Sequence, residues 1–417
     1  MRIRPTRLLL PCGAVAYAGL SAASAFLINA RTDLDISFWP SALEAAHGHP
    51  LLVYSVAGHS AYPNANGPLA LLPLSLVALI ASRTGLEANT HAYTAIALAA
   101  FSVFSMLLAR EAMLLVDEIA PWRKRMRPWV LAATILLAPP LWLATTGFGH
   151  LEMPVELWLV ALSARQWLLN RPTRTGIALG LAVLARSSAA LYLIPLLIVN
   201  RGSERLRNTI LLTGVGVSVV VIGVAPFYVA DSSNVVHSLL TYRSDLPIGG
   251  GSFWYLLRDS AAAVVAQRFD VVVVAALGAA VCALLRAAVL RSTRVPQLVP
   301  MLFLSACSFP LLAKTSLLYY LLEPYVFAVM WWSTARSLLT PRLIAPLVLL
   351  GATLLADFGV DLPRVISLPV QSVLLSVMLA TSVAAVFVVS RIDSVRSAAA
   401  GSGHASARIG GGAATVA

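Results

Sequence analysis

The sequence is short of charge. Only 12% of its 417 residues are Asp, Glu, Lys or Arg, whereas 59% are hydrophobic. A soluble chain of this length needs far more charge to cover its surface, so the composition excludes an ordinary soluble protein. Apolar runs of about 18 or more residues recur from end to end, which is typical of helices that span a bilayer. The sequence therefore predicts an all-α, polytopic membrane protein with about 10–12 membrane segments and a helical first outer loop.

Cysteine is scarce as well. The three cysteines, Cys12, Cys282 and Cys307, lie inside apolar runs, and no CxxC or Cys/His spacing surrounds them. We expect small, buried apolar side chains, which say nothing about the redox compartment. The first apolar run follows three arginines, and its length and lack of a cleavage-like site predict a retained anchor, not a removed signal peptide.

The sequence shows no separate soluble domain and no internal repeat, so we expect residues 1–390 to form one transmembrane domain. Its two long polar stretches are residues 30–66 and 231–269. The Ala/Gly/Ser-rich tail, residues 391–417, is expected to be a disordered cytoplasmic segment. The apolar segments are approximately 8–29, 67–83, 92–116, 128–147, 150–169, 174–199, 208–230, 270–291, 296–314, 316–336, 341–356 and 368–390.

The net charge of +12 comes mostly from Lys and Arg between apolar runs. There these residues orient the chain and meet anionic lipid headgroups, so we do not expect a nucleic-acid partner. The arginines at the N-terminus predict a cytoplasmic start, and those after residues 200, 290, 335 and 390 predict cytoplasmic loops. Both long polar stretches then lie on the non-cytoplasmic face.

The basic run Arg123 to Arg127 conflicts with this count, because full crossing by every segment would place it outside. The conflict disappears if segment 67–83, which contains two prolines, does not cross. A half-crossing at 174–199, broken at Arg186-Ser187-Ser188, then restores the count, since a charge in lipid requires a broken helix beside a polar cavity. This topology moves the segment Gly149 to Glu152 to the outer face.

The first outer loop carries the most informative pattern. Asp35 is followed by Trp39, then by Gly48 with Leu51, and then by Tyr62-Pro63. This order resembles the GT-C superfamily of membrane glycosyltransferases, and within it the bacterial polyprenol-phosphate-mannose-dependent α-mannosyltransferases. That branch has an acidic residue, an aromatic residue four positions on, a Gly with a Leu soon after, and a Tyr-Pro-Pro-like turn.

Later segments agree with the resemblance. The segment Gly149 to Glu152 resembles a Gly-Gln-x-Asn-like motif of the family, and Gly176 to Pro195 resembles its Gly/Leu/Ala-rich segment with one basic residue. The segment Lys314 to Pro324 resembles the late segment that returns donor-binding residues to the outer face. The sequence departs from the family pattern at Asn64 in place of a second Pro, and in the identities of His150, Glu152, Tyr319 and Tyr320.

The resemblance implies transfer of a sugar, above all mannose, from a polyprenyl-phosphate donor to a lipid-linked or envelope glycan acceptor, with inversion. Asp35 is the expected base for the acceptor hydroxyl and Asp33 its support. In an extended segment both carboxylates would face one cavity. No metal or cofactor is expected, and the site would lie on the outer face of a bacterial inner membrane. The expected substrate-binding residues are Trp39, Tyr62, His150, Glu152, Arg186, Arg243, Lys314, Tyr319 and Tyr320.

Each residue also has an ordinary structural interpretation. Asp33 and Asp35 fit solvated loop carboxylates or a metal pair. His150 and Glu152 fit the start of an interfacial helix. Arg186 fits a buried ion pair. Snorkelling to the interface accounts for Lys314, and Arg243 fits an ordinary loop charge.

Other function classes remain open. A flippase or transporter of a lipid-linked precursor would explain Arg186 in a broken helix, although no repeat supports it. A non-catalytic assembly partner is a third interpretation. Within the enzymes, an arabinofuranosyltransferase is the nearest alternative.

Overall fold

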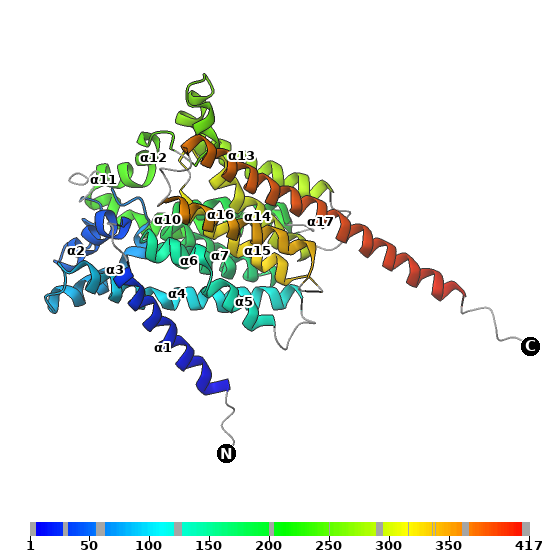
Figure 1. Cartoon of the computed structure of the whole chain (residues 1–417), viewed down its shortest axis with the longest axis horizontal. Coiled ribbons are helices and arrows are strands. Elements are labelled where there is room, and N and C mark those ends of the chain that lie inside the picture. The colour runs from blue at the N-terminus through cyan, green and yellow to red at the C-terminus, as the bar shows by residue number, and fades with distance from the viewer. Residues whose placement is uncertain are drawn as a thin grey trace, which may run out of the picture.

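In the computed structural model, every regular element of the described residues is a helix (Figure 1). The described ranges are 6–27, 32–55, 63–120, 127–199, 204–249, 251–288, 295–315, 317–335, 337, 339–360 and 367–410. The all-α prediction is confirmed for these residues.

The α-helices follow the predicted apolar segments closely. They are α1 (Thr6–Ser24), α2 (Trp39–Ala46), α3 (Pro68–Arg83), α4 (Thr90–Ile119), α5 (Arg127–Leu136), α6 (Pro139–Trp142), α7 (Glu152–Leu168), α8 (Pro172–Ala185), α9 (Leu193–Val199), α10 (Arg205–Ala230), α11 (Ser232–Val236), α12 (Tyr242–Asp245), α13 (Ala263–Ala288), α14 (Val295–Leu312), α15 (Leu322–Ser333), α16 (Ile344–Val360) and α17 (Leu368–Gly410).

Fewer helices are long enough to cross a bilayer than the sequence predicted. Among the described residues, four are long and apolar enough: Thr90–Ile119, Arg205–Ala230, Ala263–Ala288 and Leu368–Asp393. The pair Trp129–Leu136 and Pro139–Gly147, bent by 43°, makes a fifth if it is one span. The other apolar helices are shorter, since proline and polar residues interrupt the runs. The described part of this membrane protein therefore has four or five candidate spans and six shorter apolar helices, and the number of full crossings stays a prediction.

Helix α7 lies in the packed centre, against α4 on one side and α8 on the other, and α8 packs in turn against α10. The α8–α10 contact depends on small residues. A Cβ at Gly176 would come within 2.7 Å of the Leu212 carbonyl oxygen, and a Cβ at Gly180 within 2.7 Å of the Gly216 carbonyl oxygen. Small residues at this spacing allow membrane helices to approach closely.

The predicted break in segment 174–199 is confirmed. Helix α8 ends at Ala185, and Arg186 adopts an extended backbone conformation with φ −156° and ψ 129°. A 3-10 turn over Ser187–Tyr192 follows before α9. The Arg186 side chain thus lies at a helix interruption, where backbone and side-chain polar groups meet.

Helix α3 begins and ends beside the same segment of the first outer loop. At its start, the Tyr54 hydroxyl donates to the Asn66 carbonyl oxygen at 2.8 Å. Beyond its end, the Trp39 indole nitrogen donates to the Glu87 carbonyl oxygen at 3.2 Å. Whether segment 67–83 crosses the membrane stays a prediction.

The segments expected on the outer face meet one another at one end of the bundle. The Asp33 amide donates to the Phe148 carbonyl oxygen at 2.9 Å, and the Gly249 amide donates to the Lys314 carbonyl oxygen at 2.9 Å. The Gly251 amide donates to the Ser372 hydroxyl oxygen at 3.0 Å. These contacts are compatible with the predicted topology, whereas the side on which this end lies stays a prediction.

The C-terminal tail differs from the expectation. Helix α17 continues to Gly410, and Figure 1 shows it projecting beyond the packed helices, whereas the sequence predicted disorder from residue 391.

A first prediction concerns orientation. Single cysteines at Leu51 and Ser260, in a Cys12→Ser background, should react with a membrane-impermeant thiol reagent in intact cells. Both positions are exposed and belong to the two outer loops. A cysteine at exposed Arg207, the matched control for the other face, should react only after permeabilisation. Opposite accessibility of Leu51 and Ser260 would contradict a shared face.

Candidate functional site

The two loop acids lie in a helical turn, not in an extended segment. A π-helical turn over Leu34–Phe38 runs directly into α2, and Asp33 has helical φ/ψ angles of −62° and −23°. Residues two apart on a helix point in different directions, so the two carboxylates do not share partners as an extended segment would allow. This part of the first outer loop is helical, as predicted, and the shared orientation that an extended segment would give does not occur; each acid has its own environment.

Asp35 is held by α4 and by its own turn. The Tyr93 hydroxyl donates to Asp35 Oδ1 at 2.5 Å, and the Thr32 amide donates to Asp35 Oδ2 at 3.3 Å. The Trp39 ring stacks on the Tyr93 ring with centroids 4.0 Å apart and planes 9° apart. The expected pair Asp35 and Trp39 is therefore linked through Tyr93, which the sequence did not single out.

Asp33 pairs with a buried histidine. His150 Nε2 lies 2.8 Å from Asp33 Oδ2, and His150 Nδ1 lies 2.6 Å from Glu152 Oε1. An ionised carboxylate only accepts hydrogen bonds, so two ionised partners require a proton on each ring nitrogen, which makes His150 an imidazolium. Burial alone lowers the pKa of His150, but the charges of Glu152 and Asp33 and their hydrogen bonds outweigh it and raise the pKa above 6.5.

Gly149 allows the outer loop to approach this histidine. Its φ of +79° lies in the left-handed region, and an added Cβ would come within 2.7 Å of the Leu34 backbone nitrogen. Only glycine meets both requirements without strain. The predicted segment Gly149 to Glu152 therefore joins the first loop to the start of α7.

Arg186 is almost fully buried, with 7% of its surface exposed, and two acids share it. Its Nη1 lies 2.8 Å from Glu323 Oε1 and 3.4 Å from Glu156 Oε2. The acids have further partners, because the Tyr192 hydroxyl donates to Glu323 and the Ser188 hydroxyl donates to Glu156. The ion-pair interpretation of Arg186 is confirmed.

Tyr319 and Tyr320 connect the charged group around His150 with the charged group around Arg186. Tyr319 lies against His150, with ring centroids 3.7 Å apart. The guanidinium carbon of Arg186 lies 5.1 Å from the centroid of the Tyr320 ring. Both tyrosines belong to the 3-10 turn Leu318–Leu321 that precedes α15. The late segment thus reaches the same place as the first loop and the start of α7.

Arg243 and Lys314 interact with each other, and we refer to them as the basic pair. Phe309 links this basic pair to Tyr320. The Arg243 guanidinium covers the Phe309 ring at 4.6 Å, and Phe309 contacts Tyr320 at 4.8 Å. Arg243 Nη2 also meets Asp270 Oδ2 at 2.8 Å. Burial lowers the pKa of Lys314; nearby Arg243 adds to this shift, and the acids Asp270 and Asp245 oppose it.

The structure brings together nearly all the predicted site residues. Tyr62 lies outside the described residues. Within the described part of the chain, no group of three or more His, Cys, Asp or Glu side chains could hold a metal ion, and the expectation of a metal-free site stays a prediction. Sequence reasoning missed Tyr93, Tyr192 and Glu323 as site residues. An acid inside the apolar segment 316–336 was a signal that could have found Glu323.

Comparison with known proteins adds no assignment. No model of a protein family matches the chain, and a search of curated proteins gives no match. Functional inference therefore depends on the residues and their geometry.

A second prediction concerns pH. Because its pKa is raised on folding, His150 contributes stability that is fully present below pH 6.5 and is lost as pH rises through the folded-state pKa. His150→Gln should remove this part of the pH dependence, which thermal unfolding in detergent at several pH values would measure. His47→Gln, at an exposed histidine, is the control. Identical pH slopes in wild type and His150→Gln would refute the imidazolium assignment.

A third prediction concerns Arg186. Arg186→Met leaves Glu156 and Glu323 buried without their cation, which should lower the free energy of unfolding by about 3–5 kcal/mol. Arg207→Met, at an exposed residue that meets Glu204, should change it little. Denaturant unfolding in detergent measures both, and equal stability of the two variants would contradict the shared ion pair.

Proposed function

We propose that this chain is a GT-C-like membrane glycosyltransferase. It transfers a sugar, in the first instance mannose, from a polyprenyl-phosphate donor to a lipid-linked or envelope glycan acceptor on the outer face of a bacterial inner membrane. One observation carries the proposal. The resemblance assigns to one site three segments that are far apart in sequence, namely 33–39, 148–152 and 314–320. Side chains of these segments meet at His150, which contacts both Asp33 and Tyr319.

Asp35 is the proposed base. Asp33 faces the imidazolium of His150, which compensates its charge, whereas Asp35 meets a neutral phenol and a backbone amide. A base must take the acceptor hydroxyl's proton while that oxygen attacks the anomeric carbon, and the donor phosphate leaves with the bonding electrons. Attack from the face opposite the phosphate inverts the anomeric configuration.

Arg243 and Lys314 are the proposed counter-charges of the leaving phosphate. Cations placed where negative charge develops stabilise the transition state. Arg186 is held by Glu156 and Glu323, so we assign it to support of the site and not to contact with phosphate. No metal takes part in this proposal, because polyprenyl phosphate is already an activated leaving group.

A second candidate is a transporter of a lipid-linked precursor. The observation that favours it is the buried group of Glu156, Arg186 and Glu323 beside a helix break, since such ionisable groups within a membrane protein often mark a substrate or ion pathway. Transport without sugar transfer by the purified protein would favour this candidate.

A fourth prediction tests the base. Asp35→Asn keeps the shape of the side chain and removes its basicity, so turnover should fall by at least about 10²-fold while donor binding survives. Asp33→Asn should reduce turnover less. The assay is transfer of labelled mannose from a polyprenyl-phosphate donor to membrane lipid acceptors by purified variants. Asp259→Asn, at an exposed loop acid, is the control.

Two results would change the mechanism. Full activity in Asp35→Asn with loss in Asp33→Asn would move the base by two residues and leave the enzyme class standing. Full activity in both variants would refute the mechanism and favour the transporter or the non-catalytic assembly partner.

A further inference from the structure

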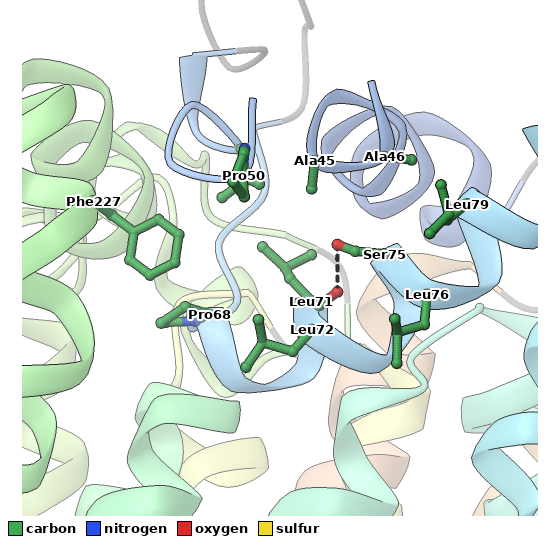
Figure 2. A pocket seen from close by; sticks show the side chains of 11 residues that line it. Ala45, Ala46, Pro50, Pro68, Leu71, Leu72, Ser75, Leu76, Leu79 and Phe227 are labelled. Carbon is green, nitrogen blue, oxygen red and sulfur yellow. Dashed lines mark hydrogen bonds between the residues drawn. The ribbon is translucent and has the colours of Figure 1, made fainter. Parts of the chain in front are cut away.

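An apolar groove lies beside the proposed site. Helix α2, the connection after it, α3 and the end of α10 enclose a cavity of about 220 Å³ (Figure 2). Ala45, Ala46 and Pro50 line one side, and Leu72 and Leu76 the other. Ser75 is the one polar side chain of the lining, and its hydroxyl donates to the Leu71 carbonyl oxygen of its own helix. Nothing in the lining offers a polar ligand a free partner, so the groove suits hydrocarbon.

The groove is open along α3. Its lining residues Leu72 and Leu76 are 58% and 63% exposed. The cavity is smaller than the roughly 300–1,000 Å³ of pockets that enclose whole small molecules. It therefore fits a segment of a hydrocarbon chain that enters from the bilayer, with the remainder of the lipid outside.

Charged residues beside the groove indicate which lipid head it accepts. His49 Nδ1 lies 2.9 Å from Glu44 Oε1, and His47 Nε2 lies 3.6 Å from Glu87 Oε2. Glu44, His47 and His49 are sequence neighbours of the lining residues, and the lining contains no Lys or Arg. Carboxylates repel a lipid phosphate, whereas carboxylates and imidazoles bind the hydroxyl groups of a sugar.

Helix α2 joins the groove to the proposed site. Ala45 follows Trp39 by six residues, which is about 9 Å along the helix axis. Trp39 stacks on Tyr93, which holds Asp35. The basic pair Arg243 and Lys314 is linked to His150 by a series of ring contacts through Phe309, Tyr320 and Tyr319.

We propose that this groove binds the hydrocarbon chain of a neutral glycolipid acceptor, so that a sugar hydroxyl of its head group reaches Asp35. The assignment rests on the proposed glycosyl transfer, in which the phosphate-bearing donor belongs beside Arg243 and Lys314. The acceptor is then a membrane lipid with an uncharged sugar head and at least one alkyl chain.

Photo-crosslinking to the purified full-length protein in lipid nanodiscs tests occupancy without requiring activity. The probes are a diazirine-bearing alkyl mannoside, a diazirine-bearing polyprenyl phosphate and a diazirine-bearing phosphatidylglycerol, each mapped by mass spectrometry of peptides. We expect the alkyl mannoside to label residues 45–53 and 68–79 and the two phosphate lipids not to label them. Equal or stronger labelling there by polyprenyl phosphate would assign the groove to the donor, and equal labelling by phosphatidylglycerol would assign it to bulk lipid; either overturns the proposal.

A matched pair of variants adds a kinetic test. Leu72→Trp fills the groove, whereas Ile80→Trp changes a residue of α3 that is 53% exposed and does not line it. Leu72→Trp should weaken alkyl-mannoside labelling and raise the KM for this acceptor by about tenfold, as expected for the loss of roughly two buried methylene groups. The KM for the donor and the activity on a tail-less methyl mannoside should not change.

The outcomes separate the two proposals. A raised donor KM in Leu72→Trp, or equal effects of Leu72→Trp and Ile80→Trp, would overturn the acceptor assignment while transfer activity stands. Specific groove labelling by the alkyl mannoside in a wild-type protein that transfers no sugar would refute the glycosyltransferase proposal and leave a glycolipid-binding groove.

Discussion

The need to pair ionisable groups inside an apolar helical bundle governs this structure. Arg186 meets Glu156 of α7 and Glu323 of α15, and a charge at this depth without such partners would be strongly destabilising. The helix interruption after Ala185 turns the Arg186 side chain toward both acids. The pairing therefore fixes three helices relative to one another at the end of the bundle where the loop acids lie.

The same constraint shapes the histidine group. His150 is buried and both of its ring nitrogens bond to carboxylates, which requires a doubly protonated ring between Asp33 and Glu152. Gly149 lets the backbone of the first loop approach closely enough for this contact. Tyr319 then contacts both groups, since its ring lies 3.7 Å from the His150 ring and 6.0 Å from the Arg186 guanidinium carbon. The first loop, the start of α7 and the turn before α15 are thus joined by buried polar contacts, which resist separation.

Much of this arrangement could be predicted from sequence because hydrophobic length and charge placement act locally. The positions of most helices and the break at Arg186 followed from apolar runs, prolines and a charge inside an apolar segment. The partners did not follow. Glu323 is 137 residues from Arg186, and Tyr93 is 58 residues from Asp35, so only tertiary packing reveals these contacts. The π-helical turn at Leu34 was also missed, since no simple pattern distinguishes it from an extended loop.

Pairing also decides which charges remain for chemistry. A buried charge that already has a close opposite charge is neutralised, and withdrawing it toward a substrate would expose its partner. By this argument Arg186 and Asp33 belong to the scaffold, although their residue types suit a phosphate ligand and a base. Asp35 accepts hydrogen bonds from the Tyr93 phenol and the Thr32 backbone amide and is not ion-paired by these contacts. Arg243 is ion-paired with Asp270, and Lys314 interacts with Arg243, Asp270 and Asp245, so two basic and two acidic side chains share this region. A phosphate beside Arg243 and Lys314 must therefore compete with these acids, whereas the partners of Asp35 carry no charge that a hydroxyl nucleophile would have to displace.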